Sequence, residues 1–128
     1  MTTVLLLEDN ADMLKVLGMM LEQAGYKVIY ARSAQEGLAV LKDGKHVPDV
    51  ILCDMVMPTT DGMSVLTHVR SVPELHSIPF VLMSGYSSPE KQREAFALGA
   101  DAFLVKPFPF ASLNTIIRNL GIDTPAKV

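Results

Sequence analysis

Residues 50–58 read VILCDMVMP, and this stretch decides the fold. Residues 50–53 are apolar at every position, and the acid Asp54 follows them directly. A short run without polar alternation is typical of a strand whose two faces are both covered by helices. The stretch therefore predicts a central strand of a parallel sheet, with a carboxylate at the carboxyl end of the strand.

Four more apolar runs accompany this one, and longer segments with helical periodicity separate them: residues 4–7, 28–31, 80–83 and 102–105. Such alternation predicts five βα units around one parallel sheet. Ser33 and Glu36 have the spacing of a capping box, and Ser88 precedes Pro89, so helices are expected to begin there. Glycines stand where helices are expected to end: Gly25, Gly44, Gly99 and Gly121.

The first expected helix is apolar on more than one face. Its periodicity predicts a core stripe of Met13, Leu17, Met20 and Ala24, flanked by Val16 and Leu21. Leu14, Gly18 and Met19 remain outside this stripe. They form either ordinary apolar surface or a patch that docks a partner.

Length and composition point to a single domain. The 128 residues are 49% hydrophobic, and we expect residues 1–122 to form the domain and residues 123–128 a frayed tail or linker stub. A net charge of -3 without any basic run argues against direct nucleic-acid binding. No apolar run approaches a membrane span, and the single cysteine, Cys53, fits a reducing compartment, so we expect a cytoplasmic location.

Polar side chains follow four of the five predicted strands. Glu8 and Asp9 follow the first, Asp54 the third, Ser84 the fourth and Lys106 the fifth. Because the carboxyl ends of parallel strands share one edge of the sheet, three acids and one lysine are expected to crowd together there. Such a cluster repels itself unless a cation neutralises it, and its hard oxygen ligands favour Mg2+. The sequence therefore predicts a magnesium site with room for phosphate oxygens.

Taken in order, these motifs resemble the receiver domain of bacterial two-component response regulators over nearly the whole chain. They are Glu8-Asp9, Asp54 followed by Met57-Pro58, Asp61-Gly62, Ser84-Gly85, and Lys106-Pro107 after Phe103. Several ordered motifs at strand ends are far more specific than any one of them. The resemblance implies an α/β, flavodoxin-like, doubly wound (βα)5 fold with a five-stranded parallel sheet of order 2-1-3-4-5.

The resemblance also implies a role for each residue of the acidic edge. Asp54 would be the phosphoacceptor, attacking the phosphorus of a phosphohistidine, while Lys106 and the Ser84 hydroxyl would contact the phosphate oxygens. Asp9, Asp54 and the backbone carbonyl of Val56 would hold Mg2+. Glu8 would join them either directly or through water.

Four further residues have implied roles in switching or in shaping the site. Ser84 would move toward the phosphoryl group while Phe103 turns inward, whereas the simpler reading of Phe103 is a permanently buried core residue. Pro58, Gly62 and Pro107 would shape the loops, and a cis bond before Pro107 would fix Lys106 in place. For Asp54 the simpler reading is a helix cap or a loop acid, and for Lys106 it is a solvated lysine at a strand end.

The implied function is a phosphorylation-dependent signalling switch, not a turnover enzyme, that catalyses its own phosphorylation. A histidine kinase or a histidine phosphotransfer protein would supply the phosphoryl group. The changed surface would act on an output partner or on an effector domain outside this sequence, and homodimerisation is left open. Stand-alone protein, fragment of a larger regulator and part of a hybrid kinase all remain open as contexts.

Three other functions agree less well with the sequence. A degenerate receiver that works as an adaptor without phosphate disagrees with the intact set of Asp54, Ser84 and Lys106. A phosphohydrolase that forms an aspartyl phosphate usually has Asp-x-Asp after its first strand, whereas here Asp9 is followed by Asn10, Ala11 and Asp12. Flavin or nucleotide binding would need a glycine-rich phosphate loop after the first strand, and none is present there.

Overall fold

The computed structural model describes residues 2–57, 60–86 and 88–120. Strands and helices alternate through these residues, which confirms the prediction of five βα units. The strands are β1 (Thr3–Leu7), β2 (Lys27–Ala31), β3 (Val50–Asp54), β4 (Phe80–Ser84) and β5 (Ala102–Val105). The helices are α1 (Ala11–Gln23), α2 (Ala34–Asp43), α3 (Gly62–Ser71), α4 (Pro89–Ala97) and α5 (Phe110–Asn119). The predicted tail, residues 123–128, lies outside the described residues.

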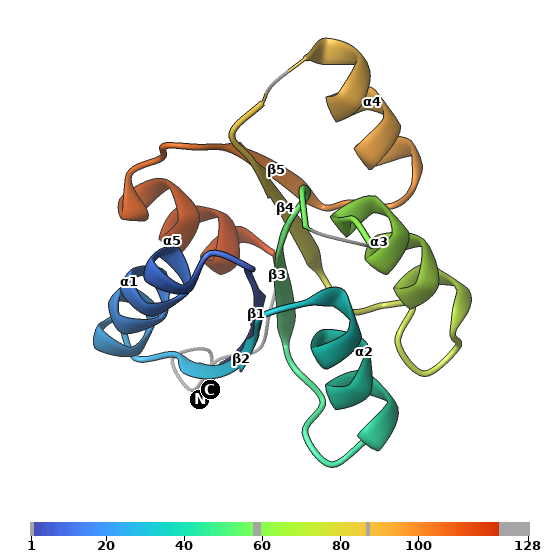
Figure 1. The fold of residues 1–128 in the computed structure, drawn as a ribbon, viewed down its shortest axis with the longest axis horizontal. Coiled ribbons are helices and arrows are strands. Elements are labelled where there is room, and N and C mark those ends of the chain that lie inside the picture. Colours follow the sequence, from blue (N-terminus) through green and yellow to red (C-terminus); the bar gives the residue numbers. More distant parts are fainter. Residues whose placement is uncertain (1, 58–59, 87, 121–128) are drawn as a thin grey trace.

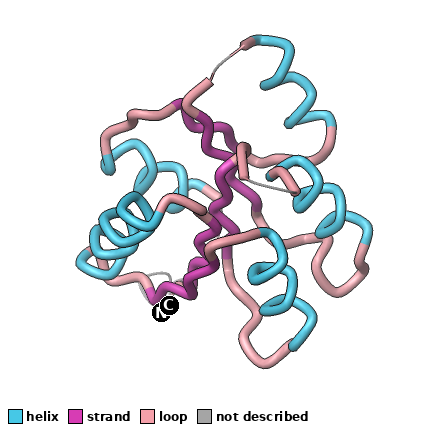
Figure 2. Tube along the Cα trace, viewed as in Figure 1, coloured by secondary structure: helices cyan, strands magenta, loops and turns pink. Residues whose placement is uncertain are grey.

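The five strands form one parallel sheet of order β2-β1-β3-β4-β5, which confirms the predicted order. Helices α1 and α5 lie on one side of the sheet, and α2, α3 and α4 lie on the other (Figure 1). The strands run through the middle, and the helices and loops surround them (Figure 2). Among the described residues, no helix is long and apolar enough to cross a membrane.

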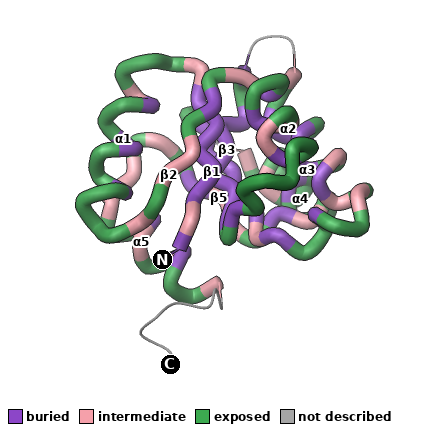
Figure 3. The backbone as a smooth tube through the Cα atoms, turned by 90° about the horizontal axis from the view of Figure 1, so that it is seen from below, coloured by how far each residue is buried: buried purple, intermediate pink, exposed green. Residues whose placement is uncertain are grey.

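Burial explains why the inner strands carry no polar alternation. Every residue of β3 and β4 is buried, and burial is concentrated in the central strands (Figure 3). Successive side chains of a strand point to opposite faces, so β3 sends Ile51 and Cys53 to the cluster under α2 and α3. Val50 and Leu52 join the cluster under α1 and α5. The described residues therefore form two apolar layers, one on each face of the sheet.

The predicted helix boundaries are confirmed where the chain is described. The side chain of Ser33 accepts a hydrogen bond from the backbone N–H of Glu36, and that of Ser88 accepts one from Lys91, directly before the N-terminal Pro89 of α4. Positive φ angles occur at three of the predicted stops, Gly25, Gly44 and Gly99. The fourth, Gly121, lies outside the described residues.

The predicted core stripe of α1 is confirmed for Leu17 and the flanking Leu21, which are buried, but it is wrong for Val16, Met20 and Ala24, which are exposed. The other buried residues of the helix are Leu14 and Gly18. Gly18 explains the error, because a Cβ at that position would lie 2.2 Å from the ring of Tyr30. The helix turns its glycine toward β2 so that Tyr30 can pack there. Of the three residues left over, only Met19 is exposed, so they do not form a common surface patch.

Arg70 joins three segments on the side of the sheet that carries α3 and α4. Its guanidinium donates to the carbonyl oxygens of Gly99, His76 and Ile78 at 2.7–3.1 Å and pairs with Asp101 at 3.0 Å. The same Asp101 oxygen accepts a hydrogen bond from the backbone N–H of Phe80, at the start of β4. The end of α3, the start of β4 and the loop before β5 are thereby held together.

Replacing Arg70 by lysine is expected to destabilise the fold, because an ammonium group cannot span carbonyls that a planar guanidinium reaches together. We expect Arg70→Lys to lower the free energy of unfolding by about 2 kcal/mol. Urea denaturation measures this loss. The matched control is Arg93→Lys on the exposed surface of α4, expected to cost less than about 0.5 kcal/mol. Equal stability of the two variants would contradict the bridging role.

Candidate functional site

The acidic edge of the sheet is built by strand register. Leu7 of β1 pairs with Cys53 of β3, so the next residues, Glu8 and Asp54, stand at the same level. On the other side Ser84 pairs with Val105, and Lys106 follows directly. All predicted polar residues therefore come to one edge because each is placed at, or directly after, the carboxyl end of its strand.

Lys106 lies between two of the acids. Its Nζ is 2.7 Å from Oε1 of Glu8 and 3.2 Å from Oδ2 of Asp54. Glu8 is 1% exposed and Asp54 7%, so both carboxylates are withdrawn from water. Burial alone would lower the pKa of Lys106, but the hydrogen bond to Glu8 and the charges of Asp54 and Glu8 outweigh it and raise that pKa. Lys106 is thus held in its charged form.

The predicted metal ligands also come together. Glu8, Asp9 and Asp54 each offer a carboxylate oxygen, and these oxygens lie within 4.8 Å of one another. Asp9 is only half-buried, so the cluster is open to solvent on its side. Hard carboxylate oxygens at this spacing fit a magnesium ion, which keeps several of its waters when it binds to protein.

Backbone groups complete the surroundings of Asp54. The N–H of Val56 donates to Oδ1 of Asp54 at 3.3 Å. The carbonyl of Val56, which is a predicted metal ligand, lies in the same loop. Gly62 begins α3 against this loop, and its N–H donates to the carbonyl of Met55. A Cβ at Gly62 would lie 2.6 Å from the backbone oxygen of Asp54, which explains the glycine. The third predicted loop residue, Pro58, lies outside the described residues.

Ser84 is buried, and its hydroxyl is engaged with the following loop. Its Oγ donates to the carbonyl of Tyr86 at 2.7 Å and accepts from the N–H of Tyr86 at 3.0 Å. The sequence indicated Ser84 as a site residue but carried no sign of this contact, because the partner is backbone. A shift of the hydroxyl would therefore also release the start of the loop that leads to α4.

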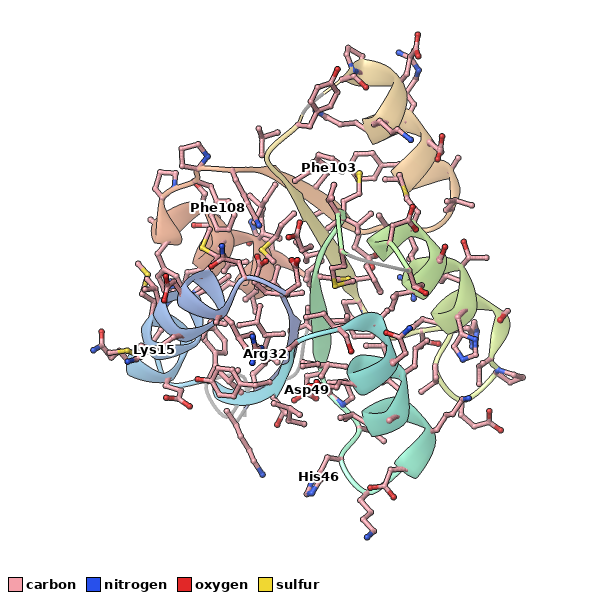
Figure 4. All side chains as sticks on the ribbon, in the orientation of Figure 1. Lys15, Arg32, His46, Asp49, Phe103 and Phe108 are labelled. Carbon is pink, nitrogen blue, oxygen red and sulfur yellow. The ribbon has the colours of Figure 1, made fainter. Side chains whose placement is uncertain are left out.

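The two phenylalanines near Lys106 lie on opposite sides of the sheet. Phe103 is half-buried on the side of α4, and Phe108 packs on the side of α1 and α5 (Figure 4).

A pocket of about 280 Å³ adjoins Ser84 and is lined by Met63, Tyr86 and Lys91 among others. Sequence reasoning did not single out Lys91, since only the fold brings α4 beside the site.

Pro107 and Cys53 are the remaining residues beside the site that the sequence singled out. The Lys106–Pro107 bond is cis, the isomer that the resemblance suggested. Cys53 precedes the phosphoacceptor candidate but is fully buried. Burial, and then the charges of Asp54, Glu8 and Asp61, raise the pKa of its thiol well above the ordinary value. The thiol is therefore held protonated, and the cluster of candidate metal ligands among the described residues consists of Glu8, Asp9 and Asp54 without it.

Comparisons with known proteins agree with this geometry. Residues 4–118 match the family described as response regulator receiver domain. The phosphate regulon transcriptional regulatory protein PhoB of Pseudomonas aeruginosa is 28% identical over 123 residues, which are 93% of this chain and 53% of PhoB. This chain therefore spans about half the length of that relative.

Two solved structures are similar over nearly their whole length. The chemotaxis protein CheY4 of Vibrio cholerae has a TM-score of 0.86 at 32% identity, covering 94% of this chain and 98% of that one. The receiver domain of a signal transduction histidine kinase from Syntrophus aciditrophicus has a TM-score of 0.82 at 29% identity, covering 94% and 89%.

Removing the lysine should expose the cost of the buried acids. We expect Lys106→Met to lower the free energy of unfolding by about 3 kcal/mol in metal-free buffer at neutral pH, because Glu8 then stays buried without a cation. Adding Glu8→Gln should restore at least half of that loss. Chemical denaturation measures both, and the exposed Lys42→Met serves as control. If Lys106→Met costs no more than the control, the pair does not constrain the fold.

Proposed function

The chain belongs to the family of response regulator receiver domains, which act as phosphorylation switches in two-component signalling, and we propose that Asp54 takes the phosphoryl group. The observation that carries the proposal is the position of the Lys106 ammonium, 3.2 Å from Oδ2 of Asp54 at the carboxyl edge of the sheet. A cation at this distance can stabilise the negative charge of a phosphoryl group that is bound to that carboxylate.

Transfer would proceed by attack of an Asp54 carboxylate oxygen on the phosphorus of a phosphohistidine. The new O–P bond forms as the P–N bond breaks, and the electron pair of that bond returns to the imidazole. Lys106 would contact an oxygen of the phosphoryl group and neutralise part of its charge. The chain is not a turnover enzyme in this account, because the phosphoryl group stays on its own residue.

Asp9, Asp54 and the carbonyl of Val56 would hold the magnesium ion. Glu8 would contact it either directly or through water. The support is the set of three carboxylates, whose oxygens lie within 4.8 Å of one another. Bound Mg2+ supplies positive charge against the acids and the phosphate oxygens. The half-buried position of Asp9 leaves room for the waters that such an ion keeps.

Ser84 would convert phosphorylation into a change of surface. In this structure its hydroxyl is bonded to the backbone of Tyr86, and moving it toward a phosphoryl oxygen requires both of these bonds to break. The loop between β4 and α4 would then rearrange. We propose that Phe103, half-buried beside α4, turns inward as this loop moves. Having no hydroxyl, it would choose its position by packing alone.

Response regulators interact with histidine kinases and with output domains. We propose a histidine kinase or a histidine phosphotransfer protein as donor, acting in the cytoplasm. The output is carried by a partner protein or by an effector domain outside this sequence. Relatives differ in this respect, since PhoB is a transcriptional regulator of about twice this length and CheY4 is a chemotaxis protein of similar length.

Phosphate uptake from acetyl phosphate tests the phosphoacceptor without a partner. We expect the chain to gain one phosphoryl group by intact mass in the presence of Mg2+, and to lose this gain with EDTA. Asp54→Asn should abolish it, because an amide is a far poorer nucleophile than a carboxylate. The matched control is Asp61→Asn, on an exposed acid that caps α3 outside the cluster. Failure of the unmodified chain to take up phosphate would favour an adaptor that works without it.

A further inference from the structure

A pocket of about 280 Å³ adjoins the candidate phosphoacceptor. We call it the methionine pocket after three residues of its lining, Met55, Met57 and Met63. Val56 also lines this pocket, and its N–H donates to Oδ1 of Asp54 at 3.3 Å. On the neighbouring strand, Ser84 at the end of β4 belongs to the lining as well. The wall of the pocket is therefore continuous with the proposed site of phosphoryl transfer.

The lining of the methionine pocket is mostly apolar, and its charged side chains balance each other. The three methionines are 6–7% exposed, and their unbranched thioether side chains adapt to groups of different shape. The charged side chains are one acid, Asp61, which caps α3, and one base, Lys91 in the first turn of α4. These two helices lie on the same side of the sheet (Figure 1). Such a pocket suits an uncharged apolar group.

In-line transfer would place the leaving group of a phosphodonor beside this pocket. The attacking and leaving atoms stand on opposite sides of the phosphorus. Asp54 is the last residue of β3, so a leaving group opposite its carboxylate would lie among the loops that follow β3 and β4. Val56 and Tyr86 come from these two loops, both line the pocket, and they are 66% and 73% exposed. An incoming donor would meet these two side chains first.

We propose that the methionine pocket receives the acyl chain of acyl phosphates, and that the protein takes its phosphoryl group faster from butyryl phosphate than from acetyl phosphate. This inference rests on the proposed function and names a substrate class for the same site. The new bond joins an oxygen of Asp54 to phosphorus, while the bond from phosphorus to the acyl oxygen breaks. The electron pair of that bond leaves with the acyl group, which departs as a carboxylate.

A series of donors tests the inference on the unmodified chain. Acetyl, propionyl and butyryl phosphate have the same reacting bond and the same charge, so they differ mainly in apolar surface. Second-order rate constants of phosphorylation are measured by intact mass at saturating Mg2+. We expect an increase of about 3-fold for each added methylene group, and so of about 10-fold from acetyl to butyryl phosphate, because the pocket removes these groups from water.

The donor series distinguishes failure of the inference from failure of the proposed function. Equal rate constants for the three donors, or rate constants that fall with chain length, would overturn the inference and leave Asp54 as phosphoacceptor. If none of the donors phosphorylates the chain, the proposed function fails and the inference fails with it.

A pocket variant tests whether the methionine pocket causes the preference. Met63→Gln keeps the length of the side chain and makes the lining polar, so the ratio of butyryl to acetyl rate constants should fall below about 3. The control Met19→Gln, on the exposed surface of α1, should keep the ratio of the unmodified chain. The ratio compares two donors on one variant, so a general loss of activity cancels.

Tyr86→Ala provides the same test if Met63→Gln does not fold, because it removes a wall of the pocket whose side chain is 73% exposed. A ratio that stays at the value of the unmodified chain in the folded pocket variant would place the acyl chain elsewhere and overturn the inference.

Discussion

One ammonium group holds two buried carboxylates at the carboxyl edge of the sheet, and this charge balance links the site to the fold. Lys106 comes from the end of β5, while Glu8 and Asp54 come from the ends of β1 and β3. Three strand ends must therefore be in register for the acids to be compensated. A buried carboxylate without a cation is costly, so the same contact that prepares the chemistry also rewards correct assembly of the sheet.

The rest of the architecture keeps this edge accessible while the strands are covered. Helices lie on both faces of the sheet, so polar groups can emerge only where strands end and loops begin. The strand order turns at β1 and β3, with β2 on one side and β4 and β5 on the other. Such a turning point leaves an opening outside the carboxyl ends, and the three acids gather there. Lys106 closes the cluster from the far side of β4.

The strands and the acidic edge were predictable because their signals are local. Residues 50–53 are all apolar because both faces of this strand are buried, and Asp54 follows them directly in the chain. The orientation of α1 was not predictable, because apolar residues surround that helix and the decisive contact is between Gly18 and Tyr30. The partner of Ser84 also escaped prediction, since it is the backbone of Tyr86. The depth at which Glu8 is buried depends on its pairing with Lys106, which follows it by almost the whole chain.

The most direct measurement identifies the residue that carries the phosphoryl group. Borohydride reduces an aspartyl phosphate to homoserine, so the phosphorylated chain can be reduced, digested and mapped by peptide mass spectrometry. We expect homoserine at position 54 and unmodified acids at positions 8 and 9. A reduced acid at either of those positions, or phosphate retained on a residue other than Asp54, would contradict it.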